Sequence, residues 1–354
     1  MLKTFSLCVV ALLFISFNSE GQTGNKEEPA GATGPKGAAS VGGLAKDYVP
    51  NKDAVEAKNQ GNAALDKGDY EEALKLYNKS IALDSRYPNP VVNRGVIFFE
   101  QKKYPEAIAD FTKAIELDPK LALGYCLRGK VNSRLEKYAE AIADFTKAIE
   151  LDPKDADAYN GRGYRYSDLK KYPEAIADHT KAIELDPKYM FAYFGRGVTY
   201  RNLKKHTEAI SDFTKAIELD PKYVDAYYNR GSAYADLKKY PEAIAEYTKT
   251  IELDSKYAAA FSSRGDSYGK LKKYPEGLAD YKKATELDPN MYYGLGLIHA
   301  KLKRYPEAIA DFTKAIELDP KFADAYYNRG NAYKLLGKAK EAIADFAKAK
   351  EPEK

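Results

Sequence analysis

The sequence is poor in the residues that most often carry chemistry. Its 354 residues contain three histidines, two cysteines and no tryptophan. No cysteine or histidine cluster has the spacing of a metal site, no glycine-rich phosphate loop follows a strand pattern, and no Ser, His and acid set stands out. We therefore expect no catalytic residue, no metal and no cofactor, and we predict that the protein is not an enzyme.

An excess of charge of one sign is also lacking. There are 56 Lys and Arg against 52 Asp and Glu, so the formal net charge is +4. This balance gives no electrostatic push toward nucleic acid, and we expect no nucleic-acid partner.

Long hydrophobic runs are absent apart from residues 5–17 near the N-terminus. That run is shorter than the roughly 20 residues that a spanning helix needs. Lys3 precedes it, and Ser19 and Gly21 place small residues at −3 and −1 of a cleavage site. The pattern predicts a signal peptide over 1–21, with an uncleaved anchor or a buried helix as the alternative. We expect export to a periplasmic, cell-envelope or secreted location, and a mature chain without a membrane span.

The chain beyond residue 21 divides into two parts. Residues 22–53 are rich in Gly, Ala, Pro and Lys and are interpreted as a flexible linker. The rest of the chain repeats itself, because EAIADFTKAIELDPK recurs unchanged at 106–120, 140–154 and 307–321. The period is 34 residues, and one unit has lost three. Nine units result: 54–87, 88–121, 122–155, 156–189, 190–223, 224–257, 258–291, 292–322 and 323–354.

Numbered places within each unit carry the same kinds of residue. Place 8 is Gly in every unit, place 20 is Ala in eight units, and place 24 is aromatic or His. These spacings put the small and large residues of each half-unit on one helical face, which predicts two helices per unit with small residues where the helices approach. Pro at place 18 and Asp-Pro at places 31–32 are interpreted as helix starts.

This pattern resembles the tetratricopeptide repeat, with Gly at place 8, Ala at 20, an aromatic at 24 and Pro at 32. The resemblance covers 54–354. It implies an all-α fold, a right-handed superhelical solenoid of stacked antiparallel helix pairs. The first helices would line a concave groove. Departures occur at Ala57, Ala64, Val91, Asn132 and in the shortened eighth unit.

The resemblance also implies which residues face the groove, at places 2, 5, 6, 9, 12 and 13. The candidates for partner binding are Lys58, Asn62, Asn93, Phe99, Lys130, Asn160, Tyr164, Phe191, Phe194, Arg201, Tyr228, Asn229, Tyr293, Tyr327 and Asn328. We therefore predict a non-catalytic scaffold that binds a protein or peptide in this groove, in envelope-associated complex assembly. The alternative for each aromatic is packing between units.

One motif of the family can be compared residue by residue. The carboxylate clamp of some co-chaperones has five positions, and Lys58, Asn62 and Asn93 match three of them. Leu123 and Leu127 stand where the remaining two cations would be. Without those cations a C-terminal carboxylate would have far fewer charge-assisted bonds, so the clamp is not expected here.

Two periodic sets of charges complete the pattern. Arg at place 7 accompanies an acid at place 23 in seven units, for example Arg162 with Asp178, and we hypothesise a ladder of partly buried ion pairs that fixes the packing of the units. Lys-Lys fills places 15–16 in five units. These turns offer an alternative function, as an adaptor for anionic polysaccharide or lipid along a basic edge.

Overall fold

The computed structural model describes residues 48–351. The predicted signal peptide and residues 22–47 of the predicted linker lie outside the described residues. Within 48–351, none of the helices combines the length and the apolar character that a membrane crossing requires.

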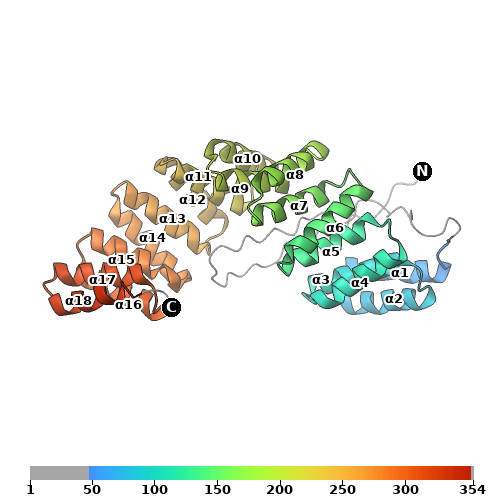
Figure 1. Ribbon diagram of the computed structural model, residues 1–354, viewed down its shortest axis with the longest axis horizontal. Coiled ribbons are helices and arrows are strands. Elements are labelled where there is room, and N and C mark those ends of the chain that lie inside the picture. The colour runs from blue at the N-terminus through green and yellow to red at the C-terminus, as the bar shows by residue number, and fades with distance from the viewer. Residues whose placement is uncertain (1–47, 352–354) are drawn as a thin grey trace. The chain divides into compact units, whose positions relative to one another are not determined.

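All regular structure in residues 48–351 is helical, and the helices alternate between two kinds (Figure 1). We call the first helix of each unit its A helix and the second its B helix. The A helices are α1 (Lys52–Asp66), α3 (Pro88–Glu100), α5 (Ala122–Arg134), α7 (Ala156–Asp168), α9 (Met190–Asn202), α11 (Val224–Asp236), α13 (Ala258–Lys270), α15 (Tyr292–Lys301) and α17 (Ala323–Leu335). The B helices are α2 (Tyr70–Leu83), α4 (Tyr104–Leu117), α6 (Tyr138–Leu151), α8 (Tyr172–Leu185), α10 (His206–Leu219), α12 (Tyr240–Leu253), α14 (Tyr274–Leu287), α16 (Tyr305–Leu318) and α18 (Ala339–Lys348).

The described chain divides into two compact parts, and the division falls within α9, between Thr199 and Tyr200. We call them the N-terminal part and the C-terminal part. Inside each part a B helix packs against its own A helix and against the A helix that follows. The connecting turns are too short for anything except an antiparallel return. The predicted all-α array of antiparallel helix pairs is therefore confirmed.

The close approach within each pair depends on place 8. A Cβ added to Gly95 would lie 2.8 Å from the ring of Phe111, and one added to Gly231 would lie 2.9 Å from the ring of Tyr247. Both rings are almost completely buried. Ala107, at place 20 beside the first of these rings, is fully buried as well. The prediction that small residues at places 8 and 20 bring the two helices together around an aromatic is confirmed.

The proline signals have different outcomes. Pro at place 18 lies in the first turn of α4, α8, α12, α14 and α16, as predicted. The prediction that Asp-Pro at 31–32 is a helix start holds at Asp288 and Pro289, where the Asp288 side chain caps the short 3₁₀ helix η1 (Pro289–Met291), and is wrong at the other sites. Asp118 instead ends α4 with its N–H bonded to the Ala114 carbonyl, and its carboxylate accepts the Lys120 N–H at 3.0 Å. The dipeptide thus shapes the turn, and α5 begins after it at Ala122.

The turn from each A helix to its B helix needs one residue with positive φ, at place 15. Gly68 and Gly337 supply it at the two ends of the array. Elsewhere a residue with a side chain adopts it: Lys102, Glu136, Lys170, Lys204, Lys238, Lys272 and Lys303, with φ between 57° and 61°. This left-handed conformation costs an L-residue about 1–2 kcal/mol relative to its ordinary backbone states.

The shortened eighth unit loses its residues from the A helix. Its A helix, α15, has 10 residues, whereas the neighbouring A helices have 13. A short 3₁₀ turn, η1 (Pro289–Met291), leads into it. At the other end, α1 begins at Lys52, two residues before the predicted first repeat, with the Asn51 side chain accepting the Asp53 N–H at 2.8 Å.

Candidate partner-binding face

The candidate residues lie on the A helices, and we call the surface that the A helices form on each compact part its A-helix face. In the N-terminal part this face begins with an amide pair. Asn93 on α3 donates to the side-chain oxygen of Asn62 on α1 at 2.8 Å, and the Tyr77 hydroxyl donates to the same oxygen at 2.8 Å. Lys58 is half-buried with no hydrogen bond or ion pair in the described part of the chain, and burial lowers the pKa of its amine.

Further along the N-terminal part, a charged pair joins two A helices. Lys130 on α5 forms an ion pair with Asp157 on α7. The Tyr189 hydroxyl donates to the other oxygen of Asp157 at 2.8 Å. Both members of the ion pair keep about a fifth of their side-chain surface exposed. Their charges are thus accessible to a ligand without being fully solvated.

Three candidates of the N-terminal part lie in the interior. Asn160 is 2% exposed, its side-chain oxygen bonds to the ring of His179, and its side-chain amide donates to the Tyr189 hydroxyl. Tyr164 and Phe194 are also buried, and the Tyr164 hydroxyl reaches the Phe191 carbonyl at 3.2 Å. These side chains shape the face from beneath, since little of their own surface is available for contact.

Phe99 and Phe191 lie between core and surface. Both are half-buried, Phe99 with its ring 6.1 Å from Tyr104 and Phe191 edge-on to Tyr189 at 6.0 Å. Part of each aromatic ring remains available to a ligand.

In the C-terminal part, polar contacts again join successive helices. Arg201 on α9 donates to the side-chain oxygen of Asn229 on α11 at 2.9 Å, and Asn229 in turn donates to the Asp225 carbonyl. Tyr228 stacks at 5.0 Å on Tyr257 and reaches a serine hydroxyl of α13 at 3.4 Å. All of these candidates are half-buried.

The last candidates occur on α15 and α17. Asn328 donates to the Tyr293 hydroxyl at 3.0 Å, while the Tyr293 ring packs 4.6 Å from Phe322. Tyr327 is 54% exposed and contacts Phe346. Tyr327 is therefore the most accessible aromatic among the candidates.

Two acids at place 2, a predicted groove-facing place, also organise this face, although they are not among the candidates for partner binding. Asp157 and Asp225 stand at place 2, and each accepts a hydrogen bond from the tyrosine at place 34 of its own unit, Tyr189 or Tyr257. Burial raises the pKa of the Asp225 carboxyl. The joint occurrence of Asp at place 2 and Tyr at place 34 in the fourth and sixth units was the signal that could have found them.

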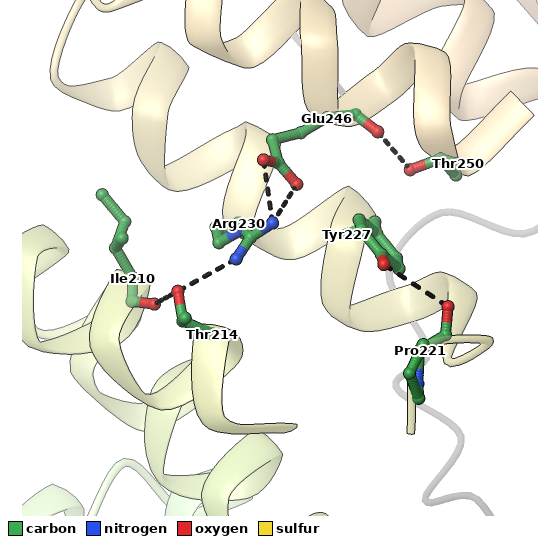
Figure 2. Close-up of polar contacts among 7 residues, drawn as sticks. All are labelled: Ile210, Thr214, Pro221, Tyr227, Arg230, Glu246 and Thr250. Atoms are coloured by element: carbon green, nitrogen blue, oxygen red, sulfur yellow. Dashed lines mark hydrogen bonds and ion pairs between the residues drawn. The ribbon is translucent and has the colours of Figure 1, made fainter. Parts of the chain in front are cut away.

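The arginines at place 7 are occupied within the fold. Figure 2 shows Arg230 of α11 donating to both carboxylate oxygens of Glu246 on α12 at 2.9 Å and to the Thr214 hydroxyl on α10 at 3.0 Å. The same pairing joins Arg94 with Asp110, Arg128 with Asp144, Arg162 with Asp178, Arg264 with Asp280 and Arg329 with Asp345. The predicted ladder is confirmed for these pairs. Because the guanidinium groups are already paired, they are structural and are not anion ligands.

Residues 48–351 contain no group of three or more His, Cys, Asp or Glu side chains placed to hold a metal ion. The side chains of the A-helix face make hydrogen bonds, an ion pair and aromatic contacts.

Comparison with known families agrees with the repeat pattern. A family model described as tetratricopeptide repeat matches residues 92–121, 122–155, 156–189, 224–257 and 258–291. A second, described as TPR repeat, matches 61–102, 199–238 and 296–337, and a third matches 180–211. Together these matches cover more than half of the chain. No curated protein matches the sequence.

Solved structures of the same kind are similar to this chain. A tetratricopeptide repeat protein from Parabacteroides merdae is 21% identical with a TM-score of 0.55, over 70% of this chain and 99% of that one. The C-terminal part of a TPR repeat-containing protein from Cytophaga hutchinsonii is 23% identical with a TM-score of 0.52, over 67% and 98%. YrrB, described as a TPR protein with an unusual peptide-binding site, is 28% identical with a TM-score of 0.45, over 54% and 97%. The first two support the fold alone.

Proposed function

Because the chain belongs to the tetratricopeptide repeat family, we propose that it is a non-catalytic scaffold whose A-helix face binds a peptide or protein segment of a partner. The observation that carries the proposal is the series of half-buried polar contacts between successive A helices. These contacts are Asn93 to Asn62, Lys130 to Asp157, Arg201 to Asn229, Tyr228 to Ser263 and Asn328 to Tyr293.

Such contacts suit a peptide ligand for a physical reason. An extended peptide presents alternating donors and acceptors along its backbone, and amide and hydroxyl side chains can bond to either kind. The half-exposed aromatics beside them supply apolar contact at a low cost in side-chain entropy. The face carries both signs of charge, Lys130 and Arg201 with Asp157 and Asp225. The proposed ligand is therefore a polar segment of mixed charge with aromatic or aliphatic anchors.

The setting is part of the same proposal. The charged residue, short apolar run and small residues of 1–21 support an exported protein, in the periplasm, in the cell envelope or secreted. There the scaffold would hold partner proteins together in an envelope-associated assembly.

Selection from a peptide-display library against the full chain tests the function. Arg201→Met removes one cation from the A-helix face and leaves the acceptor of Asn229 without its donor. Hydrogen bonds to charged groups contribute about 1.5–3 kcal/mol, so peptides that use this region should bind Arg201→Met roughly tenfold or more weakly. The matched control is Lys249→Met, which removes one cation from the B helix α12, where Lys249 pairs only with Glu252.

Three variants separate the outcomes, provided that circular dichroism shows equal folding. Selected peptides that weaken with Arg201→Met or with Lys130→Met, and not with Lys249→Met, support the A-helix face. Peptides that bind all three variants equally, or a library that yields no binder, would contradict the proposal.

A further inference from the structure

A second surface lies at one end of the helix stack in the C-terminal part. Consecutive helices from α10 to α18 run antiparallel to one another, so the turns that lead into α10, α12, α14, α16 and α18 all lie at the same end of their pairs. We call these five turns the turn edge. It comprises residues 203–205, 237–239, 271–273, 302–304 and 336–338.

The composition of the turn edge repeats with the units. Each turn starts with a leucine. Four turns then carry two adjacent cations, Lys204 and Lys205, Lys238 and Lys239, Lys272 and Lys273, and Lys303 and Arg304, whereas the fifth carries Lys338, with Lys340 two residues further on in α18. One glutamate follows in the first turn of each B helix. Asp236 directly precedes the second turn and, with Glu242, balances its two lysines, while the other four turns keep a net positive charge.

These cations have no carboxylate within ion-pair distance anywhere in the described residues. The lysines of the B helices behave differently: Lys249 pairs with Glu252 at 3.0 Å and Lys283 pairs with Glu286 at 2.8 Å. Both sets of lysines are exposed to solvent, and Lys249 and Lys283 have a carboxylate partner while the turn-edge cations have none. The turn edge thus carries positive charge that no carboxylate neutralises directly.

Three of the five leucines of the turn edge are exposed, whereas Leu271 and Leu302 are half-buried. Leu203 and Leu237 are each 37% exposed and Leu336 is 39% exposed, among the few large apolar side chains of the described chain that reach this level. Each stands directly before the cations of its turn. Apolar side chains among unpaired cations form the pattern of a surface that lies in the interface of an anionic bilayer.

Nothing in the turn itself requires lysine. Lys204, Lys238, Lys272 and Lys303 occupy the left-handed conformation that disfavours a side chain, and Gly337 fills the same place in the last turn without that cost. A residue held at a conformational cost that the fold does not demand points to a role outside the fold.

We propose that the turn edge docks onto a lipid surface that carries anionic headgroups. The lysines and the arginine contact the headgroup phosphates while Leu203, Leu237 and Leu336 enter the boundary between headgroups and acyl chains. This contact is peripheral and lies on turns, so it leaves the A-helix face available to a partner protein. A dissolved polyanion could engage the cations but would have no use for the leucines.

Vesicle partition of the full chain tests the proposal. The readout is the ratio of partition coefficients between vesicles of phosphatidylcholine with about a third phosphatidylglycerol and vesicles of phosphatidylcholine alone. Taking the ratio cancels any lipid affinity of residues 5–17. In the test variant, Lys204, Lys205, Lys238, Lys239, Lys272 and Lys273 are changed to Gln. In the control variant, Lys215, Lys222, Lys249, Lys256, Lys283 and Lys321 are changed to Gln. This removes the same charge from the B helices of the C-terminal part and from the turns that follow them, at the other end of the helix pairs.

We expect the ratio to fall at least tenfold in the test variant and less than twofold in the control. A second variant, Leu203→Ser with Leu237→Ser and Leu336→Ser, should lower binding to the anionic vesicles and leave binding to soluble dextran sulfate unchanged. Equal ratios in the test and control variants would overturn the proposal. If the leucine variant binds anionic vesicles like the wild type, the lipid surface is excluded and the edge is assigned to a soluble polyanion such as an anionic polysaccharide.

Discussion

At the scale of single residues, His179 shows how one position of the repeat tolerates a polar ring. It stands at place 24, where other units have Phe or Tyr, and its ring is fully buried against Gly163 and Gly195. Its Nδ1 lies 3.0 Å from the Asn160 side-chain oxygen, so the neutral ring can donate there. Burial lowers the pKa of His179 to about 3, and the ring is therefore uncharged in the folded protein at neutral pH.

This pKa predicts a pH dependence of stability. Between pH 6.5 and about 3 the unfolded chain binds a proton at His179 and the native chain does not, so stability is lost as the pH falls through this window. From pH 7 to pH 5 the loss should be about 2 kcal/mol. His179→Phe should remove that part of the dependence, measured as the urea midpoint at the two pH values by circular dichroism.

The reciprocal change provides the control. Phe145 occupies the same place one unit earlier, fully buried and beneath Gly129 and Gly161. Phe145→His should therefore acquire the dependence that His179→Phe loses. An unchanged difference between pH 7 and pH 5 in His179→Phe would show that the folded ring titrates as it does in the unfolded chain.

At the scale of helices, the place 7 arginine joins three elements at once. Arg162 of α7 donates to both carboxylate oxygens of Asp178 on α8 and, at 3.1 Å, to the Thr146 hydroxyl on α6. The partners lie sixteen residues away on either side. The side chain thus connects its own B helix to the B helix of the preceding unit.

The eighth unit shows what happens when this arginine is absent. Leu295 stands at place 7, and the acid Asp311 is met instead by His299 at 2.6 Å. Lys282 of the preceding unit stands at the place that Thr146 occupies in its own unit. The arginine and its hydroxyl acceptor are thus both replaced here, while the acid is retained and takes a histidine as its partner.

A double-mutant cycle on Arg162→Met and Asp178→Asn measures the strength of this network. Arg162→Met alone should destabilise the protein by about 3 kcal/mol or more, because Asp178 is left buried without a cation. The coupling between the two changes should be about 1.5–3 kcal/mol, read from urea unfolding. The exposed pair Lys181 and Glu184, three residues apart on α8, is the control and should couple by less than about 0.5 kcal/mol. Equal coupling for the two pairs would mean that the arginine does not fix the packing.

At the scale of the whole molecule, each helix contacts only its near neighbours along the chain. In the C-terminal part α13 packs with α12 and α14, and weaker contacts reach α11 and α15. Stability in such an array is a sum of local terms, so a local defect should remain local.

Hydrogen exchange measured by mass spectrometry can follow this behaviour. Arg264→Met breaks contacts of α13 with Asp280 on α14 and Thr248 on α12. Amide exchange should accelerate in α12, α13 and α14 and stay at the wild-type rate in α17 and α18. Accelerated exchange throughout the C-terminal part would instead indicate that this part unfolds as a single cooperative body.

The sequence by itself determined the all-α class, the order of the helices, the contact of glycine with the aromatic ring, and the arginine pairs. Each of these depends on residues at fixed separations along one period, which a single chain displays directly. The sequence was less reliable where a residue has two local roles, and Asp118 ends one helix where a start of the next was predicted.

Only the tertiary structure decided which residues of the A helices remain accessible. Tyr164 and Phe194 are buried while Tyr327 is exposed, although the same positional rule selected all three. Exposure depends on what the neighbouring helix places opposite each side chain, such as the Phe191 carbonyl beside Tyr164. The structure also separated paired from unpaired lysines, because the distance to a carboxylate is set by packing and turn geometry and not by the period.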